Sequence, residues 1–582
     1  MTFCRRCLPF LALPGLLFTA IYARPQSAPS NSGSVLMETM DAELHRAMAS
    51  LGKTAGKNGE QPAPYFLSYS VADATTWSIA AQYGSIIGDN NVVHRRSADV
   101  QVRIGSPEQD NTHGEHRNSA LTTIGLPLED NRAALARSFW YATNRGYGRA
   151  LDSYLKVKTE QQVRAKEEDT SNDFSVEKPV TSSIAPGPSL TPDRAKWETR
   201  LRELSAMFRA YRNIFYSVVA LNASDETDYF LSSEGTKVST PYHKARLVIL
   251  ARARAEDGMD LFRVETFEAD TLDGLPSQQE IATKITAMAK NLEALRVAPI
   301  TEPYNGPAIL SGRASAVFFH EVLGHRLEGQ RQRGDEEGQT FTKMLGKSIL
   351  PSFMSVVDDP TLTTFHGVPL SGQYRFDDEG QPAQRVDLIK DGTLKTFLMS
   401  RLPIASFAHS NGHGRAQSGR MPTGRQGNLI VSSEKTVSDA ELRKMLIEEA
   451  KKQGKAYGLY FEDISSGFAV TTRRSPQAFQ VIPLVVYRVY VDGRPDELVR
   501  GVSIVGTPLA ALNRIVATGD HQDVFNGECG AESGTVPVSA VAPPMLVTEI
   551  ETQRQAQGTA RPPILPPPAF DDNALPAKKE VR

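Results

Sequence analysis

The sequence predicts an α+β protein with two domains, a mixed α/β N-terminal domain and a β-rich C-terminal domain. Three observations support this prediction. The 582 residues exceed the roughly 150 residues of one common domain. The composition, 40% hydrophobic and 23% charged, is typical of a folded globular chain. Helical and strand-like patterns alternate before residue 300, and strand-like patterns prevail after it.

The overall composition excludes several classes of protein. Lys and Arg number 65 against 67 Asp and Glu, so the chain lacks the basic excess that nucleic-acid binding requires. No apolar run of about 20 residues follows the N-terminal segment, which argues against an integral membrane span. Three cysteines are too few for a disulfide-stapled fold.

The first residues resemble an export signal. Arg5 and Arg6 precede an apolar stretch over 7–22, and the small residue Ala23 ends it. We therefore expect a signal peptide over 1–23, cleaved near Ala23, and a periplasmic or secreted protein. An uncleaved anchor is the alternative, and the choice between the general and the twin-arginine export routes stays open. After cleavage Cys529 is the one remaining cysteine, either a buried small apolar residue or a residue held for chemistry.

The predicted N-terminal domain covers 36–300. A polar loop rich in Ser, Thr, Pro and Gly over about 169–192 has too little apolar content for a core, and we expect it to be flexible. The other segments are predicted as helices over 35–51, 129–168, about 194–211 and 276–296, and as strands within 64–104 and near 213–220, 227–240 and 244–254.

The predicted C-terminal domain covers 303–552. A short strand at 306–310 leads into a helix, and strands and turns fill 350–400. Ser438 and Glu441 have the spacing of a capping box and open another helix, which Gly454 closes before further strands. The Pro-rich tail over 553–582 is expected to be extended.

The sharpest chemical motif is His320-Glu-Val-Leu-Gly-His325, inside an apolar helix expected over 314–327. Imidazoles bind zinc, and a neighbouring carboxylate can act as a base on water. The histidines are five residues apart, about 140° around a regular helix. They can share one ion only if the helix is distorted, as by a π-bulge, which Gly324 makes easier. Two unrelated histidines on a helix are the alternative.

A second motif surrounds Cys529, which lies among glycines at 527–534 and just before a strand. A thiolate at this position could be a third metal ligand. Two histidines and one cysteine would form a catalytic zinc set with one position left for water.

Several motifs, in order over about 305–550, resemble the TldD/PmbA family of metallopeptidases. They begin at Gly306, His320, Val356, Asp377, Leu388 and Cys529. The resemblance implies a two-domain fold, zinc held by His320, His325 and Cys529, peptidase activity on peptides or unfolded segments, and a dimer that encloses the site. The intact metal motif is similar to the TldD-like branch. The N-terminal half resembles the family only in layout, and an export signal is unexpected for it.

Other residues receive roles as hypotheses. Glu321 would accept a proton from water and pass it to the leaving amine. Glu328 could orient His325, or instead pair with Arg331 or lie at a helix end. His413 is either a substrate contact or an ordinary loop residue. Arg420 could bind a peptide carboxylate, or it could instead form a salt bridge.

The leading interpretation is a zinc-dependent peptidase in which Glu321 is the general base. An extended peptide would add to the β-rich domain as a strand. The expected partner is a second copy or a metal-free PmbA-like paralogue. Two alternatives stay open: a catalytically silent subunit or scaffold of the same fold, and a zinc hydrolase that acts on non-peptide amides.

Overall fold

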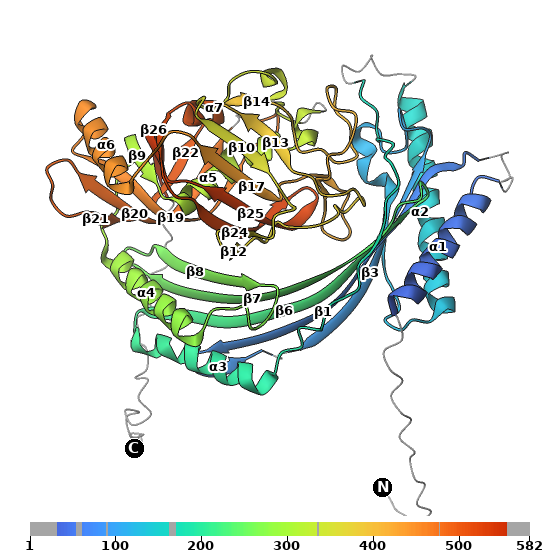
Figure 1. Ribbon diagram of the computed structural model, residues 1–582, viewed down its shortest axis with the longest axis horizontal. Helices are drawn as coiled ribbons and strands as arrows, with labels where there is room; N and C mark the ends of the chain where they lie inside the picture. Colours follow the sequence, from blue (N-terminus) through green and yellow to red (C-terminus); the bar gives the residue numbers. More distant parts are fainter. Residues whose placement is uncertain are drawn as a thin grey trace, which may run out of the picture.

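The computed structural model describes residues 32–53, 61–88, 91–161, 170–333, 337–475 and 478–555. The expected export signal over 1–23, and the tail after residue 555, lie outside these ranges. The described residues form helices and strands in both halves, and the C-terminal half is rich in strands (Figure 1). The predicted α+β class is confirmed.

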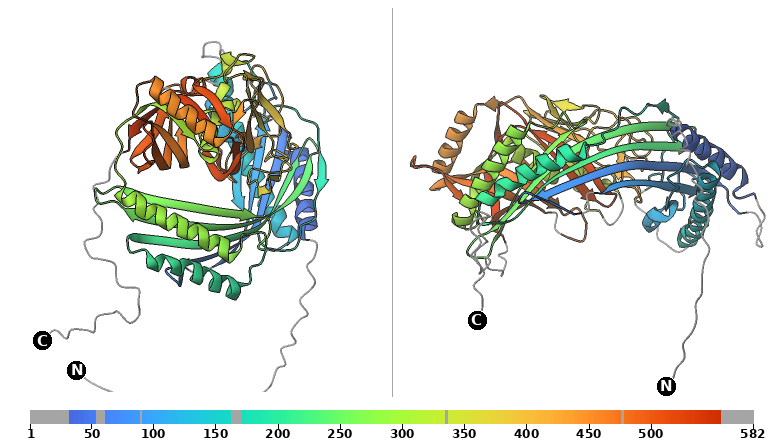
Figure 2. Two further views of the ribbon diagram at one scale, coloured as in Figure 1. Left: turned by 60° about the vertical axis from the view of Figure 1, so that its left-hand side comes forward. Right: turned by 90° about the horizontal axis from the view of Figure 1, so that it is seen from below.

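One curved sheet organises the N-terminal half. Its strands are β1 (Pro64–Gln82), β2 (Ser85–Ile87), β3 (Val92–Ile104), β4 (Leu121–Gly125), β5 (Thr181–Ser183), β6 (Ile214–Ser232), β7 (Lys237–Arg254) and β8 (Asp260–Ala269). The order is β4-β3-β1-β6-β7-β5, with β2 on β1 and β8 on β7. The sheet turns its concave side toward the C-terminal half (Figures 1 and 2).

Strand β6 differs from the prediction of two strands separated near 221–226. It is continuous because β1 and β7 pair with it along this stretch. Its polar middle, Asn222-Ala-Ser-Asp-Glu-Thr227, has the composition of a turn. In the fold, Ser224 and Glu226 face a cavity between the two halves instead of solvent beyond a turn. The polar residues of this strand therefore indicate an internal polar surface.

Four helices cover the outer side and one end of the curved sheet. They are α1 (Ser32–Ser50), α2 (Arg132–Gln161), α3 (Arg194–Ala206) and α4 (Gln278–Val297). Helices α3 and α4 lie on the convex face, and α1 and α2 lie at the opposite end (Figure 1). Helix α4 begins with a capping box between Ser277 and Glu280. Its buried residues recur at helical spacing: Ile281, Ile285, Met288, Leu292 and Leu295.

The segment expected as a loop over 169–192 differs from its prediction in the described part, 170–192. Strand β5 pairs in parallel with β7. Phe174 is 2% exposed, and its ring packs against Phe66 with centroids 4.8 Å apart. The Arg401 guanidinium lies 3.9 Å from the centre of the Phe174 ring. A single aromatic residue therefore fixes a segment whose composition suggested no core contact.

Two sheets form the C-terminal half. The first has the order β14-β13-β10-β17-β25-β24. Its strands are β10 (Met354–Asp358), β13 (Val386–Lys390), β14 (Thr393–Leu394), β17 (Asn428–Ser433), β24 (Asp523–Ala531) and β25 (Gly534–Ala542). Short pairs lie beside it, β11 (Thr364–Phe365) with β12 (Val368–Pro369) and β15 (Gly414–Arg415) with β16 (Thr423–Gly424).

The second sheet contains β9 (Asn305–Leu310), β18 (Thr436–Val437), β19 (Tyr457–Ala469), β20 (Phe479–Tyr490), β21 (Glu497–Val499), β22 (Val502–Gly506), β23 (Ile515–Gly519) and β26 (Met545–Arg554). Strands β26, β22, β20, β19 and β9 close into a ring because β9 also pairs with β26. Helices α6 (Asp439–Lys452) and α7 (Pro508–Leu512) accompany this sheet.

Helix α5 (Gly312–Val322) lies between the two sheets and packs against β19, β24 and β25. Almost every one of its side chains is buried, as expected for a helix that is apolar on all sides. The C-terminal end of helix α5 therefore lies in the interior of this half of the protein.

Ion pairs join the two halves. Arg263 of β8 donates to Asp463 of β19 at 2.7 Å, and Arg401 lies 2.7 Å from Glu234. Both arginines are largely buried, so these pairs are shielded from solvent screening. Among the described helices, none combines the length and the apolar character needed to cross a membrane.

Candidate metal centre

Helix α5 carries His320 and Glu321 into the interior. The hydroxyl of its N-cap residue Ser311 accepts a hydrogen bond from the Ala314 N–H at 3.1 Å. The helix ends at Val322, so the predicted continuous helix over 314–327 with a π-bulge is wrong.

A 3₁₀ turn over Gly324–Leu327 holds His325 instead. The backbone leaves the helix at Leu323, with φ −110° and ψ −55°, and after this break the rings of His320 and His325 lie with their centroids 5.0 Å apart. The Gln426 side chain packs closely on Gly324, because a Cβ atom there would lie 1.9 Å from Oε1 of Gln426. Because the α-helix breaks between them, the two histidine rings lie close together although they are five residues apart in sequence.

Strand β24 brings Cys529 to the two histidines. Its Sγ lies 3.2 Å from Nε2 of His320 and 3.4 Å from Nε2 of His325. The three donor atoms all lie within 4.8 Å of one another, and the three residues are buried. Residues about 200 positions apart in sequence therefore meet at one point.

The electrostatics of the three side chains favour a thiolate between two imidazoles. Burial raises the pKa of Cys529, but the nearby charges of His325 and His320 outweigh it and hold the pKa well below its ordinary value. Burial lowers the pKa of His325, yet the Cys529 thiolate and Glu328 raise it well above the usual range. A bound cation would favour the same thiolate.

Glu328 contacts both His325 and Arg331, the two partners that the sequence suggested for it. Its Oε1 lies 3.1 Å from Nδ1 of His325, and its Oε2 accepts from Nε of Arg331 at 3.2 Å. Burial raises the pKa of Glu328, but the charges of His325, Arg331 and Arg425 outweigh it and lower the pKa to about 2. This partner assigns a proton to Nδ1 of His325 and leaves Nε2 facing Cys529, where it could bind a cation.

Arg425 is a site residue that the sequence analysis missed. It is fully buried, and its Nη2 donates to the Cys529 carbonyl oxygen at 2.6 Å. Its Nη1 donates to Ser533 Oγ at 2.8 Å, and its Nε lies 3.5 Å from Glu328 Oε1. It thereby links the strand that carries Cys529 to the carboxylate that holds His325. An arginine in an irregular segment gives no periodic signal that could have identified it.

Glu321 lies beside the donor atoms. Its Oε2 is 3.9 Å from Nε2 of His325, and the residue is 8% exposed. Strand β19 passes close by, because a Cβ atom at Gly467 would lie 2.8 Å from Cγ of Glu321. The carboxylate is thus held at the centre and partly shielded from solvent.

The remaining sequence candidates lie elsewhere. His413 is fully buried, and its Nε2 lies 3.3 Å from Oδ1 of Asp358 while its Nδ1 faces Asn411. Among the described residues, its side-chain hydrogen bonds go to Asn411 and Asp358, and none joins it to the three donor atoms. Arg420 is exposed and lines the cavity between the two halves, where a ligand can reach it.

The donor set fits zinc. In a tetrahedral site, Zn–S and Zn–N bonds of about 2.3 and 2.0 Å separate sulfur from nitrogen by about 3.5 Å. The observed Sγ–Nε2 distances at His320 and His325 are 3.2 and 3.4 Å. Two imidazoles and a thiolate are three protein ligands, the number that catalytic zinc sites use.

The C-terminal half matches a known family. Residues 303–554 match the model of the PmbA/TldA metallopeptidase C-terminal domain. A metalloprotease of Archaeoglobus fulgidus is 29% identical over 239 residues, which are 41% of this chain and 51% of that protein. A zinc metalloprotease TldD homologue of Saccharolobus solfataricus is 25% identical over 250 residues, 42% of this chain and 51% of that protein.

Solved structures share the fold over a larger part of the chain. TldE from Thermococcus kodakarensis superposes with a TM-score of 0.56 at 15% identity, covering 84% of this chain and 97% of that one. A putative modulator of DNA gyrase from Thermotoga maritima gives 0.54 at 15% identity, covering 84% and 96%.

The matched region defines a domain of the PmbA/TldA metallopeptidase class. Residues 303–554 of this chain belong to the TldD/PmbA family. The chain spans about half the length of the curated relatives that it matches.

Proposed function

We propose that this protein is a zinc-dependent peptidase that hydrolyses peptides or unfolded segments. The observation that carries the proposal is the convergence of His320, His325 and Cys529 within 4.8 Å, with Glu321 beside them. Zinc, when bound, would supply Lewis-acid polarisation of the scissile carbonyl and lower the pKa of water.

The residues of the chain supply the remaining steps. His320, His325 and Cys529 would hold the ion through Nε2, Nε2 and Sγ. Glu321 would accept a proton from the attacking water and deliver it to the leaving amine. Glu328 keeps the His325 ring in place, and Arg425 keeps the Cys529 strand in place.

Strand β24 offers a place for an extended peptide. It is the terminal strand of its sheet and pairs only with β25 within the described part of the chain. Cys529 lies near its end. A peptide added to this edge would form main-chain hydrogen bonds that accept many side chains, and it would pass the metal ligands.

Organisation and location complete the proposal. We assign 36–300 and 303–552 as two domains and 1–23 as an export signal. The partner would be a second copy or a PmbA-like paralogue that encloses the site. Sedimentation of the protein at micromolar concentration, alone and with a paralogue, tests assembly, and a strict monomer would contradict it.

The test of function is a digest by the zinc-loaded protein. We expect cleavage of an unstructured peptide library, slower cleavage of folded proteins, and loss of cleavage in Glu321→Gln. The matched control Glu434→Gln changes an exposed carboxylate outside the centre and should cleave normally. Cleavage of small non-peptide amides alone would favour the amidase alternative. Zinc binding without any hydrolysis would favour the scaffold alternative.

A further inference from the structure

A cavity of about 510 Å³ lies between the concave sheet of the N-terminal half and loops of the C-terminal half. One wall of the cavity contains Val536, which lies directly opposite Cys529 in the β24–β25 pair, so that the two side chains share one face of the hairpin. The Val536 side chain packs against Cys529, so a single side chain connects this wall to the metal centre.

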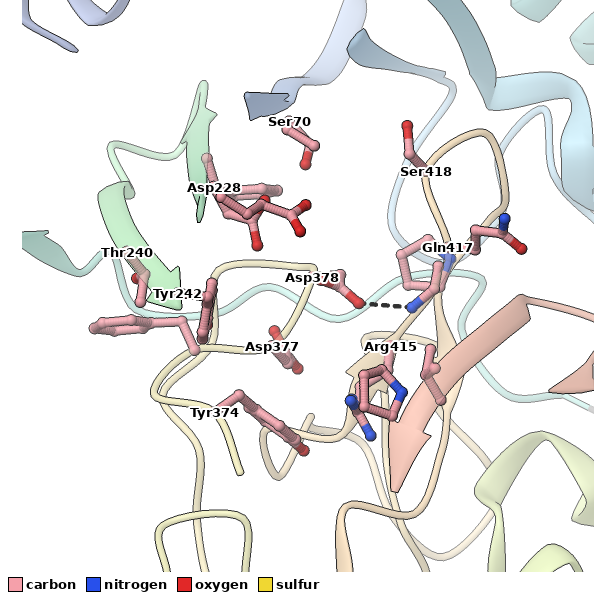
Figure 3. A pocket seen from close by; sticks show the side chains of 18 of the residues that line it. Ser70, Asp228, Thr240, Tyr242, Tyr374, Asp377, Asp378, Arg415, Gln417 and Ser418 are labelled. Carbon is pink, nitrogen blue, oxygen red and sulfur yellow. Dashed lines mark hydrogen bonds between the residues drawn. The ribbon is translucent and has the colours of Figure 1, made fainter. Parts of the chain in front are cut away.

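Carboxyl groups from both halves face this cavity. Glu226 and Asp228 lie two residues apart on β6, and both line the cavity. Asp378, from a C-terminal loop, lines the same cavity and is exposed to it, and its Oδ2 accepts from the Ala416 N–H at 2.7 Å (Figure 3). Within the described part of the chain, none of the three forms an ion pair. Burial and mutual repulsion raise the pKa of Asp228 well above its ordinary value.

Most of the basic side chains that line the cavity already have partners. Lys244 lies 3.6 Å from Glu268, His243 lies 2.7 Å from Asp225, and Arg401 lies 2.7 Å from Glu234. Arg415 donates to the Gln426 carbonyl oxygen and stacks over Tyr374. Arg420, exposed in the lining, is the remaining basic side chain, and the three carboxyl groups without ion pairs outnumber it.

Two buried hydroxyl groups also lack a partner. Thr240 lies directly opposite Asp228 on the neighbouring strand, lines the cavity and is 4% exposed. Ser68 of β1 lines the same cavity and is also 4% exposed. Neither hydroxyl makes a hydrogen bond to any residue that the structure describes. Aromatic walls, which include Tyr242 and Tyr374, complete a surface suited to a cation with an apolar stem (Figure 3).

We propose that this cavity binds the cationic nitrogen group of a peptide, either a free amino terminus or a Lys or Arg side chain, through Glu226, Asp228 and Asp378. This proposal rests on the proposed peptidase function, because it assigns a substrate class to the same site. The Thr240 hydroxyl accepts a further hydrogen bond from the bound group. Main-chain pairing with β24 accepts peptides of many sequences, and the cavity would favour those that carry a suitably placed cationic group.

The experiment measures binding by calorimetry to the zinc-loaded, full-length Glu321→Gln variant, which removes turnover. The probes are a short unstructured peptide with one lysine, the same peptide with norleucine, and the acetylated form of each. We expect loss of the bound charge to weaken binding about tenfold. Sensitivity to norleucine identifies the side chain as the source, and sensitivity to acetylation identifies the terminus.

Glu226→Gln combined with Asp228→Asn should reduce this preference to about twofold or less, because the amides keep the shape and lose the charge. The control Glu434→Gln should retain the preference. These substitutions remove repulsion between two half-buried carboxylates, and thermal unfolding measurements check that the variants fold. Equal binding of all four peptides, or an undiminished preference in the double variant, would overturn the proposal.

Turnover of the same peptides by zinc-loaded wild-type protein separates the two claims. Hydrolysis without a charge preference in binding overturns the cavity proposal and leaves the peptidase proposal standing. A charge preference in binding without hydrolysis overturns the peptidase proposal and leaves a cation-binding cavity.

Discussion

The metal centre and the neighbouring cavity both contain buried ionisable side chains, but the two regions treat charge differently. At the centre, Glu328 is surrounded by His325, Arg331 and Arg425, and its pKa falls to about 2. In the cavity, Glu226 and Asp228 face other carboxyl groups, and their pKa values are raised. Paired charges hold a site in place before a ligand arrives, whereas unpaired charges are costly until a ligand compensates them.

The largest effect should follow from removing the proposed base. We expect Glu321→Gln to lower turnover by about 10²–10⁴-fold, because an amide cannot accept the proton. Zinc content should not change, since Glu321 is not among the three donors. Peptide-cleavage kinetics and metal analysis check this. Near-normal turnover would show that another group accepts the proton.

The second-largest effect should follow from removing the charge of Glu328 at the metal centre. Glu328→Gln should weaken zinc binding about 10- to 100-fold, because His325 loses the carboxylate that orients it. Competition with a chelator measures this affinity. The control Glu532→Gln removes a more exposed partner of Arg331 and should change the affinity less than about twofold. Equal effects of the two variants would contradict a special role for Glu328.

The carboxyl groups lining the cavity should make stability depend on pH in the opposite sense to a paired carboxylate. Burial raises the pKa of Glu379 from 4.5 to about 7. Between these values the folded state keeps a proton that the unfolded state has released, so the free energy of unfolding falls as pH rises. The shift corresponds to about 3 kcal/mol.

Denaturant unfolding between pH 4 and 8 (roughly the window of this shift) tests that expectation. Glu379→Gln retains an oxygen that can accept from the Arg401 N–H, and it should lose part of the pH dependence. If the free energy of unfolding falls with pH as steeply in Glu379→Gln as in the parent protein, groups other than Glu379 cause the pH dependence.

The smallest effect should come from the rim of the cavity. Arg420 is exposed, so contact with a peptide carboxylate would contribute at most about 1 kcal/mol. Arg420→Ala should therefore raise KM up to about fivefold with little change in kcat. Blocking the peptide carboxyl terminus as an amide should abolish the difference. A fall in kcat instead would place Arg420 in the reaction.

Local sequence patterns predicted the elements whose apolar residues repeat regularly. Helix α4 was identifiable because its buried residues recur every three or four positions. The same method divided strand β6 in two, because its polar residues face an internal cavity that no local pattern reveals. It also missed the burial of Phe174, which depends on Phe66 more than 100 residues away.

The candidate centre likewise combines features that the sequence predicted with features that depend on distant residues. His320, His325 and Cys529 were selected for their chemistry, but the histidine spacing suggested a distorted α-helix, whereas the helix breaks at Leu323 and His325 lies in a 3₁₀ turn. Gln426 packs against Gly324 in this turn, a contact across about 100 residues that no local pattern reveals. Arg425 and the Glu226–Asp228 pair escaped notice because their meaning depends on neighbours from distant segments.

Zinc analysis of the purified full-length protein tests the central claim most directly. The account predicts about one zinc per chain, and Cys529→Ser should lower the content sharply, because a hydroxyl is a far poorer zinc ligand than a thiolate. Wild-type protein that stays metal-free after zinc loading, or a Cys529→Ser variant that binds zinc as tightly as wild type, would contradict it.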